Sequence, residues 1–285
     1  MYGSPVSEVS SASARLAHQP MSVFHHQPAV GGDPAVCSCV DDQVPMQGGL
    51  IDAPCLGVAL AEGKMNGTAD LLVVKDTPRE AIDPVRFVSN RSSGKMGYAI
   101  AEAASAAGHS VTLISGPATV APPDGAEFVS IITSDELHDA VHRAAPECDV
   151  LVMCAAVSDY KPATVARQKM KKRKTPFALE LVPTRDILSS LPRVNREFLV
   201  VGFAAETHDL ELNAQKKLRE KNCDMIVAND VSKTDSGLES DENEVTIFFR
   251  SGESKTISRT SKKIIARELV KIISKMSEKC LTKKT

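Results

Sequence analysis

Short runs of β-forming residues alternate with helix-forming runs from residue 70 onward, and this alternation most constrains the fold. The predicted strands are residues 71–74, 110–114, 128–132, 150–154, 199–203 and 225–227. The predicted helices are residues 98–107, 134–144, 210–221 and 261–276. Strands that alternate with helices favour a parallel sheet, because each crossover helix packs back onto the sheet. We therefore expect an α/β fold, a Rossmann-like parallel sheet with helices on both faces.

Two segments interrupt this alternation. Residues 165–175 carry six lysines and arginines, and a β-like run at 177–181 follows them. A segment of this kind can form a flexible, lysine-rich flap that closes over an anion. A solvated loop is the alternative, because charge runs usually face water. Near the end, the runs 244–249 and 255–257 flank a polar segment with a glycine, which predicts a C-terminal β-hairpin.

The first 68 residues differ from the rest of the chain. They mix Ser, Pro, Gly, Gln and His without a sustained helical or strand period. Such a segment buries too little apolar surface to order itself. We expect a disordered or loosely attached extension over residues 1–68, the main domain over 69–280 and a basic tail over 281–285.

Composition and cysteine count exclude several classes of protein. A net charge of −2 gives no case for nucleic acid as a partner, and the apolar runs are too short to cross a membrane. Seven cysteines without paired spacing indicate reduced thiols rather than a disulfide framework. The cysteines at 37 and 39 and the histidines at 25 and 26 match no zinc spacing, so metal ligands remain unknown. We expect a cytoplasmic protein.

Residues 89–97, with the sequence SNRSSGKMG, come directly before a predicted helix. A loop of small, hydroxyl and cationic residues at a helix N-terminus offers N–H groups and positive charge to an anion. The spacing is not that of a Walker A loop, since Met96 follows Lys95 where a hydroxyl is needed. The loop reads as a phosphate cradle, and an ordinary glycine-containing turn is the alternative.

Small residues followed by polar ones come after three of the predicted strands. These segments are residues 155–160, 204–207 and 228–230. Because ligands of open α/β sheets bind at the carboxyl ends of the strands, we expect the three segments to line one site.

Five segments together resemble the motifs of a known family, the phosphopantothenate-cysteine ligases. This family is also called phosphopantothenoylcysteine synthetase and forms the ligase domain of bifunctional coenzyme A biosynthesis proteins. The resemblance runs in order from about residue 70 to about residue 276. The segments are residues 83–97 (DPVRFVSNRSSGKMG), 155–160 (AAVSDY), 169–172 (KMKK), 201–207 (VGFAAET) and 228–232 (ANDVS).

The resemblance implies a ligation in two steps. The carboxylate of 4'-phosphopantothenate first joins the α-phosphate of a nucleotide and releases pyrophosphate. The amine of L-cysteine then attacks this acyl-nucleotidylate and releases the nucleoside monophosphate. Members with a Lys-x-Lys-Lys segment use CTP, so CTP with Mg²⁺ is expected rather than ATP. The family resemblance also implies a homodimer.

The resemblance also assigns catalytic and substrate-binding residues. Asn90 would hold the acyl intermediate, and Lys169 would be the catalytic lysine of the flap. Arg86 would position the pantothenate moiety across a dimer interface, and Ala155 and Ala156 would contact the substrate. No flavin-binding decarboxylase is recognisable in residues 1–68, so a separate phosphopantothenoylcysteine decarboxylase is expected and no flavin.

A larger set of residues is implied to bind the nucleotide. The set is Ser92, Gly94, Gly97, Met153, Cys154, Ala155, Asp159, Lys169, Arg185, Asp186, Ile187, Leu188, Phe203, Lys217 and Lys221. Four of these have plainer explanations. Phe203 ends a buried strand and can be core. Lys217 and Lys221 can be solvated, although lysines at this spacing repel unless an anion lies between them. Asp159 can cap a turn.

One position departs from the family pattern. The family has Gly-Gly-Thr or Gly-Pro-Thr after its first strand, and this chain has Lys75, Asp76 and Thr77 there. Without glycine the loop is either displaced, or Lys75 supplies a charge where N–H groups normally serve. A degenerate, non-catalytic member that binds phosphopantothenate or a partner is therefore the alternative function. A nucleotide-dependent reductase is a further rival, but the chain lacks G-x-G-x-x-G after residues 71–74 and a Tyr-x-x-x-Lys pair.

Overall fold

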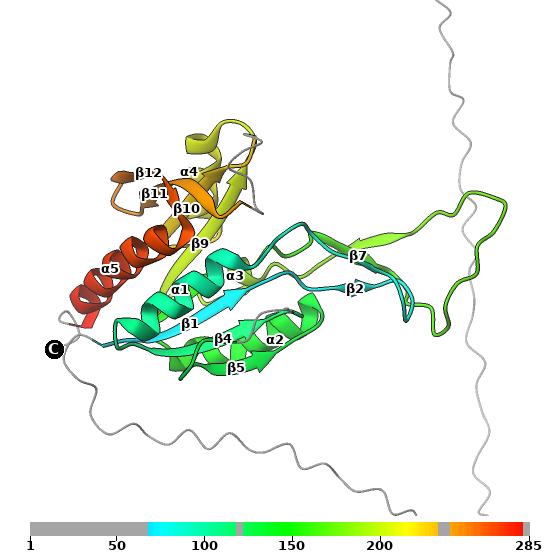
Figure 1. Cartoon of the computed structure of the whole chain (residues 1–285), viewed down its shortest axis with the longest axis horizontal. Coiled ribbons are helices and arrows are strands. Elements are labelled where there is room, and N and C mark those ends of the chain that lie inside the picture. Colours follow the sequence, from blue (N-terminus) through cyan, green and yellow to red (C-terminus); the bar gives the residue numbers. More distant parts are fainter. Residues whose placement is uncertain (1–67, 118–121, 233–239, 282–285) are drawn as a thin grey trace, which may run out of the picture. The chain divides into compact units, whose positions relative to one another are not determined.

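The computed structural model describes residues 68–117, 122–232 and 240–281, which belong to one structural unit. Except for Thr68 and Leu281, the predicted N-terminal extension and basic tail lie outside the described residues. An eight-stranded sheet forms the centre, in the order β12-β11-β10-β9-β6-β1-β4-β5 (Figure 1). Its strands are β1 (Asp70–Lys75), β4 (Ser110–Ser115), β5 (Glu127–Ser130), β6 (Val150–Met153), β9 (Leu199–Glu206), β10 (Met225–Asp230), β11 (Glu242–Phe249) and β12 (Ser254–Ser261).

Six neighbouring strands of this sheet, from β10 to β5, are parallel. β1 lies at their centre between β4 and β6, and five of its six residues are buried. Apolar, β-branched side chains suit a strand that is covered on both faces. β11 pairs antiparallel with β10 on one side and, through the turn at residues 250–253, with the edge strand β12 on the other. The predicted mainly parallel α/β sheet is confirmed.

Helices cover both faces of the sheet, as expected. α1 (Lys95–Ala106) and α5 (Lys262–Leu281) share one buried core with the sheet. α2 (Ser134–Ala144) and α4 (Leu210–Glu220) pack on the other face, in a second core. A capping box fixes the start of α2, because Thr133 and Glu136 each accept an N–H of the other. α1 begins beside the carboxyl end of β1, because Gly94 and Gly97 lie against Asp76 and Lys75, and α5 begins directly after β12.

An arm of two small antiparallel sheets extends beyond this end of the central sheet (Figure 1). One sheet pairs β2 (Glu80–Ala81) with β3 (Phe87–Val88), and the other pairs β7 (Tyr160–Pro162) with β8 (Leu181–Pro183). The predicted β-like run at 177–181 is wrong in its bounds, since residues 163–180 contain no helix or strand. Phe177 is 58% exposed, so its side chain lacks the packing that a strand would provide.

Most other predicted elements differ only at their ends. α1 begins three residues before the predicted start, and β9 and β10 each run three residues further than expected. The short helix α3 (Ile187–Ser190) was not predicted. No helix in the described ranges is long and apolar enough to cross a membrane.

Candidate active site

The predicted phosphate cradle lies at the N-terminus of α1. Gly94 is the N-cap residue with φ 62°, a left-handed conformation that favours glycine. Its N–H donates to Ser92 Oγ over 3.3 Å. Within the described residues no side chain at the N-cap hydrogen-bonds this end of α1. The first-turn N–H groups and the helix dipole therefore favour an anion at this point.

Lys75 and Asp76 lie directly beneath the cradle. Asp76 adopts φ 64°, so the glycine-like turn persists without glycine. A Cβ on Gly94 would lie 1.7 Å from Asp76 Oδ1, and one on Gly97 would lie 2.4 Å from Lys75 Cβ. The two cradle glycines thus make room for the side chains that replace the family glycines. The loop is packed closely against the end of β1.

The two replacing side chains form a buried ion pair. Lys75 is 1% exposed, its ammonium pairs with Asp76, and it lies 3.4 Å from the centroid of the Tyr98 ring. Ser115 Oγ also donates to Asp76 Oδ2 over 3.1 Å. Burial lowers the pKa of Lys75, while the hydrogen bond and charge of Asp76 oppose this shift. Asp76 therefore compensates the charge that Lys75 brings under the cradle.

The carboxyl ends of β6, β9 and β10 meet the cradle around a cavity of about 140 Å³. Seven predicted site residues line it, and its other lining residues include Asn229, Asn243, Val245 and Lys262. The seven are Ser92, Gly94, Gly97, Cys154, Ala155, Ala156 and Phe203. Phe203 is half-buried and also packs against the core, so both of its interpretations apply. The structure thus brings the cradle together with residues from all three predicted strand-end segments.

Cys154 lines this cavity as a neutral thiol. Burial raises the pKa of Cys154 to about 12, although the positive charges of Lys262 and Lys75 oppose the shift. A thiol with so high a pKa is a poor nucleophile at neutral pH. Cys154 is therefore suited to lining the site and not to covalent catalysis.

A second set of predicted residues lies around α3 and α4, outside the lining of this cavity. Lys221 pairs with Asp186, and Lys217 Nζ lies 2.7 Å from Glu206 Oε1. The expected repulsion between the two lysines is thus relieved by carboxylates. Arg185 pairs with Asp135 and Asp139 on α2, Ile187 and Met153 are buried in the core, and Leu188 packs against that core. Asp159 is exposed, and its backbone oxygen accepts the N–H of Thr184.

The arm holds the remaining predicted residues, Arg86, Asn90 and Lys169. Asn90 Nδ2 donates to Val157 O over 3.0 Å, which ties the cradle loop to the segment after β6. Arg86 Nη1 donates to the carboxylate of Asp83 at 2.6 Å and to Met170 O at 3.1 Å. Lys169 is exposed beside Met170. A cavity of about 520 Å³ between Arg86 and the flap is lined by Met170, Lys171, Lys172 and Arg173 among others.

Asp83 is a residue that the sequence analysis did not single out. Its carboxylate accepts N–H groups from Val85, Arg86 and Met170, at 2.8, 2.9 and 3.1 Å. Burial alone would raise the pKa of Asp83, but these donors and the Arg86 guanidinium outweigh it and lower the pKa. Asp83 therefore anchors the flap beside Lys169 as a charged carboxylate. An Asp before a Pro is typical of a turn, and this was the sequence feature that could have singled out Asp83.

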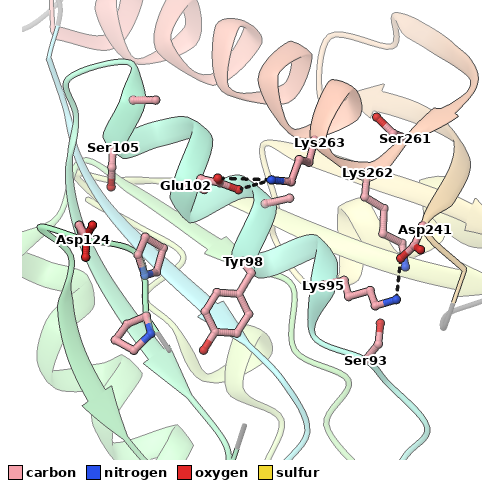
Figure 2. A pocket seen from close by; sticks show the side chains of 14 residues that line it. Ser93, Lys95, Tyr98, Glu102, Ser105, Asp124, Asp241, Ser261, Lys262 and Lys263 are labelled. Atoms are coloured by element: carbon pink, nitrogen blue, oxygen red, sulfur yellow. Dashed lines mark hydrogen bonds and ion pairs between the residues drawn. The ribbon is translucent and has the colours of Figure 1, made fainter. Parts of the chain in front are cut away.

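A larger cavity of about 950 Å³ opens on the outer side of the cradle (Figure 2). Ser93, Lys95 and Lys262 line both cavities. Lys95 Nζ bonds to Asp241 Oδ1 at 2.6 Å, across from the start of α5. Lys262 could not be selected from the sequence, because it stands among other lysines on an amphipathic helix.

A family model described as the DNA/pantothenate metabolism flavoprotein C-terminal domain matches residues 67–276. The chain belongs to this family. The coenzyme A biosynthesis bifunctional protein CoaBC of Vibrio vulnificus is 42% identical over 207 residues, 71% of this chain and 51% of the relative. CoaBC of Bacillus subtilis is 44% identical over 209 residues, 73% of this chain and 52% of the relative. The chain thus spans about half the length of these curated relatives.

A solved structure of the C-terminal domain of CoaBC matches with a TM-score of 0.64 and 40% identity. The match covers 75% of this chain and all of that domain. The predicted membership in the family of the ligase domain of bifunctional coenzyme A biosynthesis proteins is confirmed. The similar part of the chain is the part that holds the cradle, the strand ends and the arm.

Proposed function

We propose that the chain ligates 4'-phosphopantothenate to L-cysteine through an acyl-nucleotidylate, in coenzyme A biosynthesis. The observation that carries this proposal is the convergence of the cradle with the strand-end segments of the matched family around one cavity. The intact packing of Lys75 and Asp76 against Gly94 and Gly97 favours an active member over a degenerate one.

In the first step a carboxylate oxygen of phosphopantothenate attacks the α-phosphorus of the nucleotide. The bond to the β-phosphate oxygen breaks, and pyrophosphate leaves with its electron pair. The N–H groups at the start of α1 stabilise the phosphates, with Ser92 and Gly94 in the cradle. Lys169, on the flap that Asp83 anchors at Met170, adds positive charge where negative charge develops.

In the second step the cysteine amine attacks the acyl carbon of the mixed anhydride. The bond from that carbon to the bridging oxygen breaks, and the nucleoside monophosphate leaves. Asn90 and the backbone after β6, which hydrogen-bond each other, hold the acyl intermediate beside Ala155 and Ala156. The neutral Cys154 takes no part, because the acyl group passes from phosphate to nitrogen.

The nucleotide is CTP, as the Lys169–Lys172 segment of the family implies, with ATP as the poorer substrate. Magnesium enters with the triphosphate as a co-substrate. In the described part of the chain no group of three or more His, Cys, Asp or Glu side chains is placed to hold a metal. Because Mg²⁺ usually keeps waters and binds through substrate phosphates, a phosphate-carried ion suits this site. When bound, it neutralises triphosphate charge.

Two copies of the chain complete the site through the arm. Several large apolar side chains on the arm are exposed, although they lie close to the proposed substrate residues. They are Val85, Phe87, Tyr160, Val165, Phe177 and Leu181. An exposed apolar patch of this kind fits an interface between copies. The 520 Å³ cavity at Arg86 would then hold the pantothenate moiety at that interface.

The product keeps its cysteine carboxylate, and a phosphopantothenoylcysteine decarboxylase is the class of enzyme that would take the next step. A cytoplasmic location remains a prediction of the sequence.

An assay of pyrophosphate release and amide formation tests the proposal. The protein is incubated with phosphopantothenate, cysteine, Mg²⁺ and either CTP or ATP. We expect release that depends on phosphopantothenate, an amide product and faster turnover with CTP. Binding of phosphopantothenate without release from either nucleotide would instead support the degenerate alternative.

A further inference from the structure

We propose that Lys262 is a further phosphate-binding residue, which holds the outer phosphates of the nucleotide and the departing pyrophosphate. This inference rests on the proposed function. Lys262 is the first residue of α5 and is 6% exposed, yet it lines both the 140 Å³ and the 950 Å³ cavity. Burying an ammonium is costly, and buried charges in a cleft are frequent at functional sites.

The position of Lys262 is fixed by its backbone and by its neighbours. Its N–H donates to Asp241 O over 2.9 Å, and its side chain extends from α5 toward Asp241 (Figure 2). Burial and the nearby charge of Lys95 lower the pKa of Lys262, and Asp241 opposes them. Two ammonium groups thus lie close enough to repel each other. An anion between Lys95 and Lys262 would relieve that repulsion.

The location of Lys262 favours contact with the outer phosphates of the nucleotide rather than with the α-phosphate. The strand ends, where the acyl group is transferred, form one wall of the small cavity. Ser93, Lys95 and Lys262 stand where that cavity adjoins the larger one. As the bond to the α-phosphorus breaks, negative charge grows on the leaving pyrophosphate. A fixed cation at this junction stabilises that charge and the product leaving through the larger cavity.

Asp241 does not block this role. Its side chain is 84% exposed where it pairs with Lys95, and exposed ion pairs contribute little stability. A polyphosphate, with several charged oxygens, can displace the single carboxylate from Lys95. Lys262 is then the buried partner that stays in place.

The neighbouring Lys263 is a matched control. It has the same charge on the same turn but lines only the larger cavity, where its Nζ lies 3.3 Å from Glu102 Oε2 on α1 (Figure 2). Its side chain is 68% exposed. We compare Lys262→Met, Lys262→Gln and Lys263→Met with the wild-type chain. Isothermal titration measures the binding of CTP, CMP and inorganic pyrophosphate to each, and thermal unfolding without ligand checks that each variant folds.

We expect both Lys262 variants to bind CTP and pyrophosphate roughly 10- to 100-fold more weakly, as loss of a charged hydrogen bond implies. CMP binding stays unchanged, and Lys263→Met binds all three as the wild type does. Wild-type affinity for CTP and pyrophosphate in either folded Lys262 variant overturns the inference. An equal loss of CMP and CTP binding also overturns it.

The ligation assay on the same preparations separates this inference from the proposed function. If the wild-type chain makes no amide but Lys262→Met binds pyrophosphate more weakly than the wild type, the proposed function is wrong and the binding role of Lys262 is supported. If the wild-type chain makes amide and Lys262→Met binds pyrophosphate normally, the function stands and the role of Lys262 falls.

Discussion

The two sides of the candidate site use lysine in opposite ways. On the sheet side, Lys75 is buried under the cradle and paired with Asp76. On the arm side, Lys169 is exposed on a segment without helix or strand, held through Met170 and Asp83. A buried, compensated charge fixes geometry, whereas an exposed charge is free to meet a ligand. Under the proposed function, the sheet side would position the phosphates and the arm side would supply charge during the reaction.

Replacing the flap lysine tests the arm side and has the largest expected effect. Lys169→Gln removes the charge without a buried contact, so we expect kcat to fall roughly 10²- to 10³-fold. Thermal stability stays unchanged, because the side chain is exposed. Steady-state kinetics and thermal unfolding measure the two effects, with Lys174→Gln as a control on the same segment. Normal amide formation in Lys169→Gln would show that the charge on the arm is not needed for the reaction.

Breaking the buried pair tests the sheet side. Asp76→Asn keeps the size of the side chain and its tolerance of a left-handed conformation, but it leaves Lys75 buried without its carboxylate. We expect a loss of about 3 kcal/mol in the free energy of unfolding. The double variant Lys75→Met/Asp76→Asn should recover most of that loss, as urea denaturation would show. Equal stability of Asp76→Asn and wild type would mean that the pair does not hold the cradle.

Filling the space between the cradle and β1 also tests whether their packing supports nucleotide binding. Gly97→Ala places a Cβ 2.4 Å from Lys75 Cβ, so the helix start must shift. We expect about 1 to 3 kcal/mol of destabilisation from overpacking, together with an increase of the CTP KM. A CTP KM that stays at the wild-type value would separate the cradle from nucleotide binding.

The smallest expected effect is a pH dependence of stability that arises at His109, far from the site. His109 accepts the Ala69 N–H at Nδ1 over 3.1 Å, its Nε2 lies 2.8 Å from Ser274 Oγ, and burial lowers its pKa. The unfolded chain takes up a proton near pH 6.5 and the folded chain only at lower pH. Stability therefore falls as the pH drops below about 6.5. We expect Tm to fall by a few degrees, and His109→Gln to reduce that slope, in calorimetry from pH 7.5 to 5.5.

The sheet side could be predicted from the sequence more completely than the arm. Periodicity located β1, β6 and the helix after the cradle, because a strand buried on both faces leaves a continuous apolar run. The strands of the arm are two or three residues long, which is too short to show an alternation of apolar and polar residues. The predicted β-like run was therefore 177–181, whereas the strand is 181–183. The family motifs named Lys75 and Asp76 as a departure. Their packing against Gly94 and Gly97 required coordinates.

The residues that the analysis missed share one property. Asp83 and Lys262 act through neighbours that are distant in sequence, Met170 for one and the cradle for the other. Neither residue interrupts a local sequence pattern. Lys262 is one of several lysines on a helix whose sequence is that of an ordinary amphipathic helix. Residues 75–77, by contrast, were noticed because they break an expected motif. Long-range charge placement is therefore the part of the site that local sequence reasoning leaves open.

The most direct test of the account follows the fate of the α-phosphate in the absence of cysteine. Phosphopantothenate, Mg²⁺ and CTP labelled at the α-phosphorus are mixed with the protein, quenched and separated. We predict a labelled acyl-cytidylate and free pyrophosphate, which convert to the amide and CMP when cysteine is added. Formation of labelled CDP with inorganic phosphate, and of no acyl-cytidylate, would contradict the account, because the chain would then activate the carboxylate at the γ-phosphate.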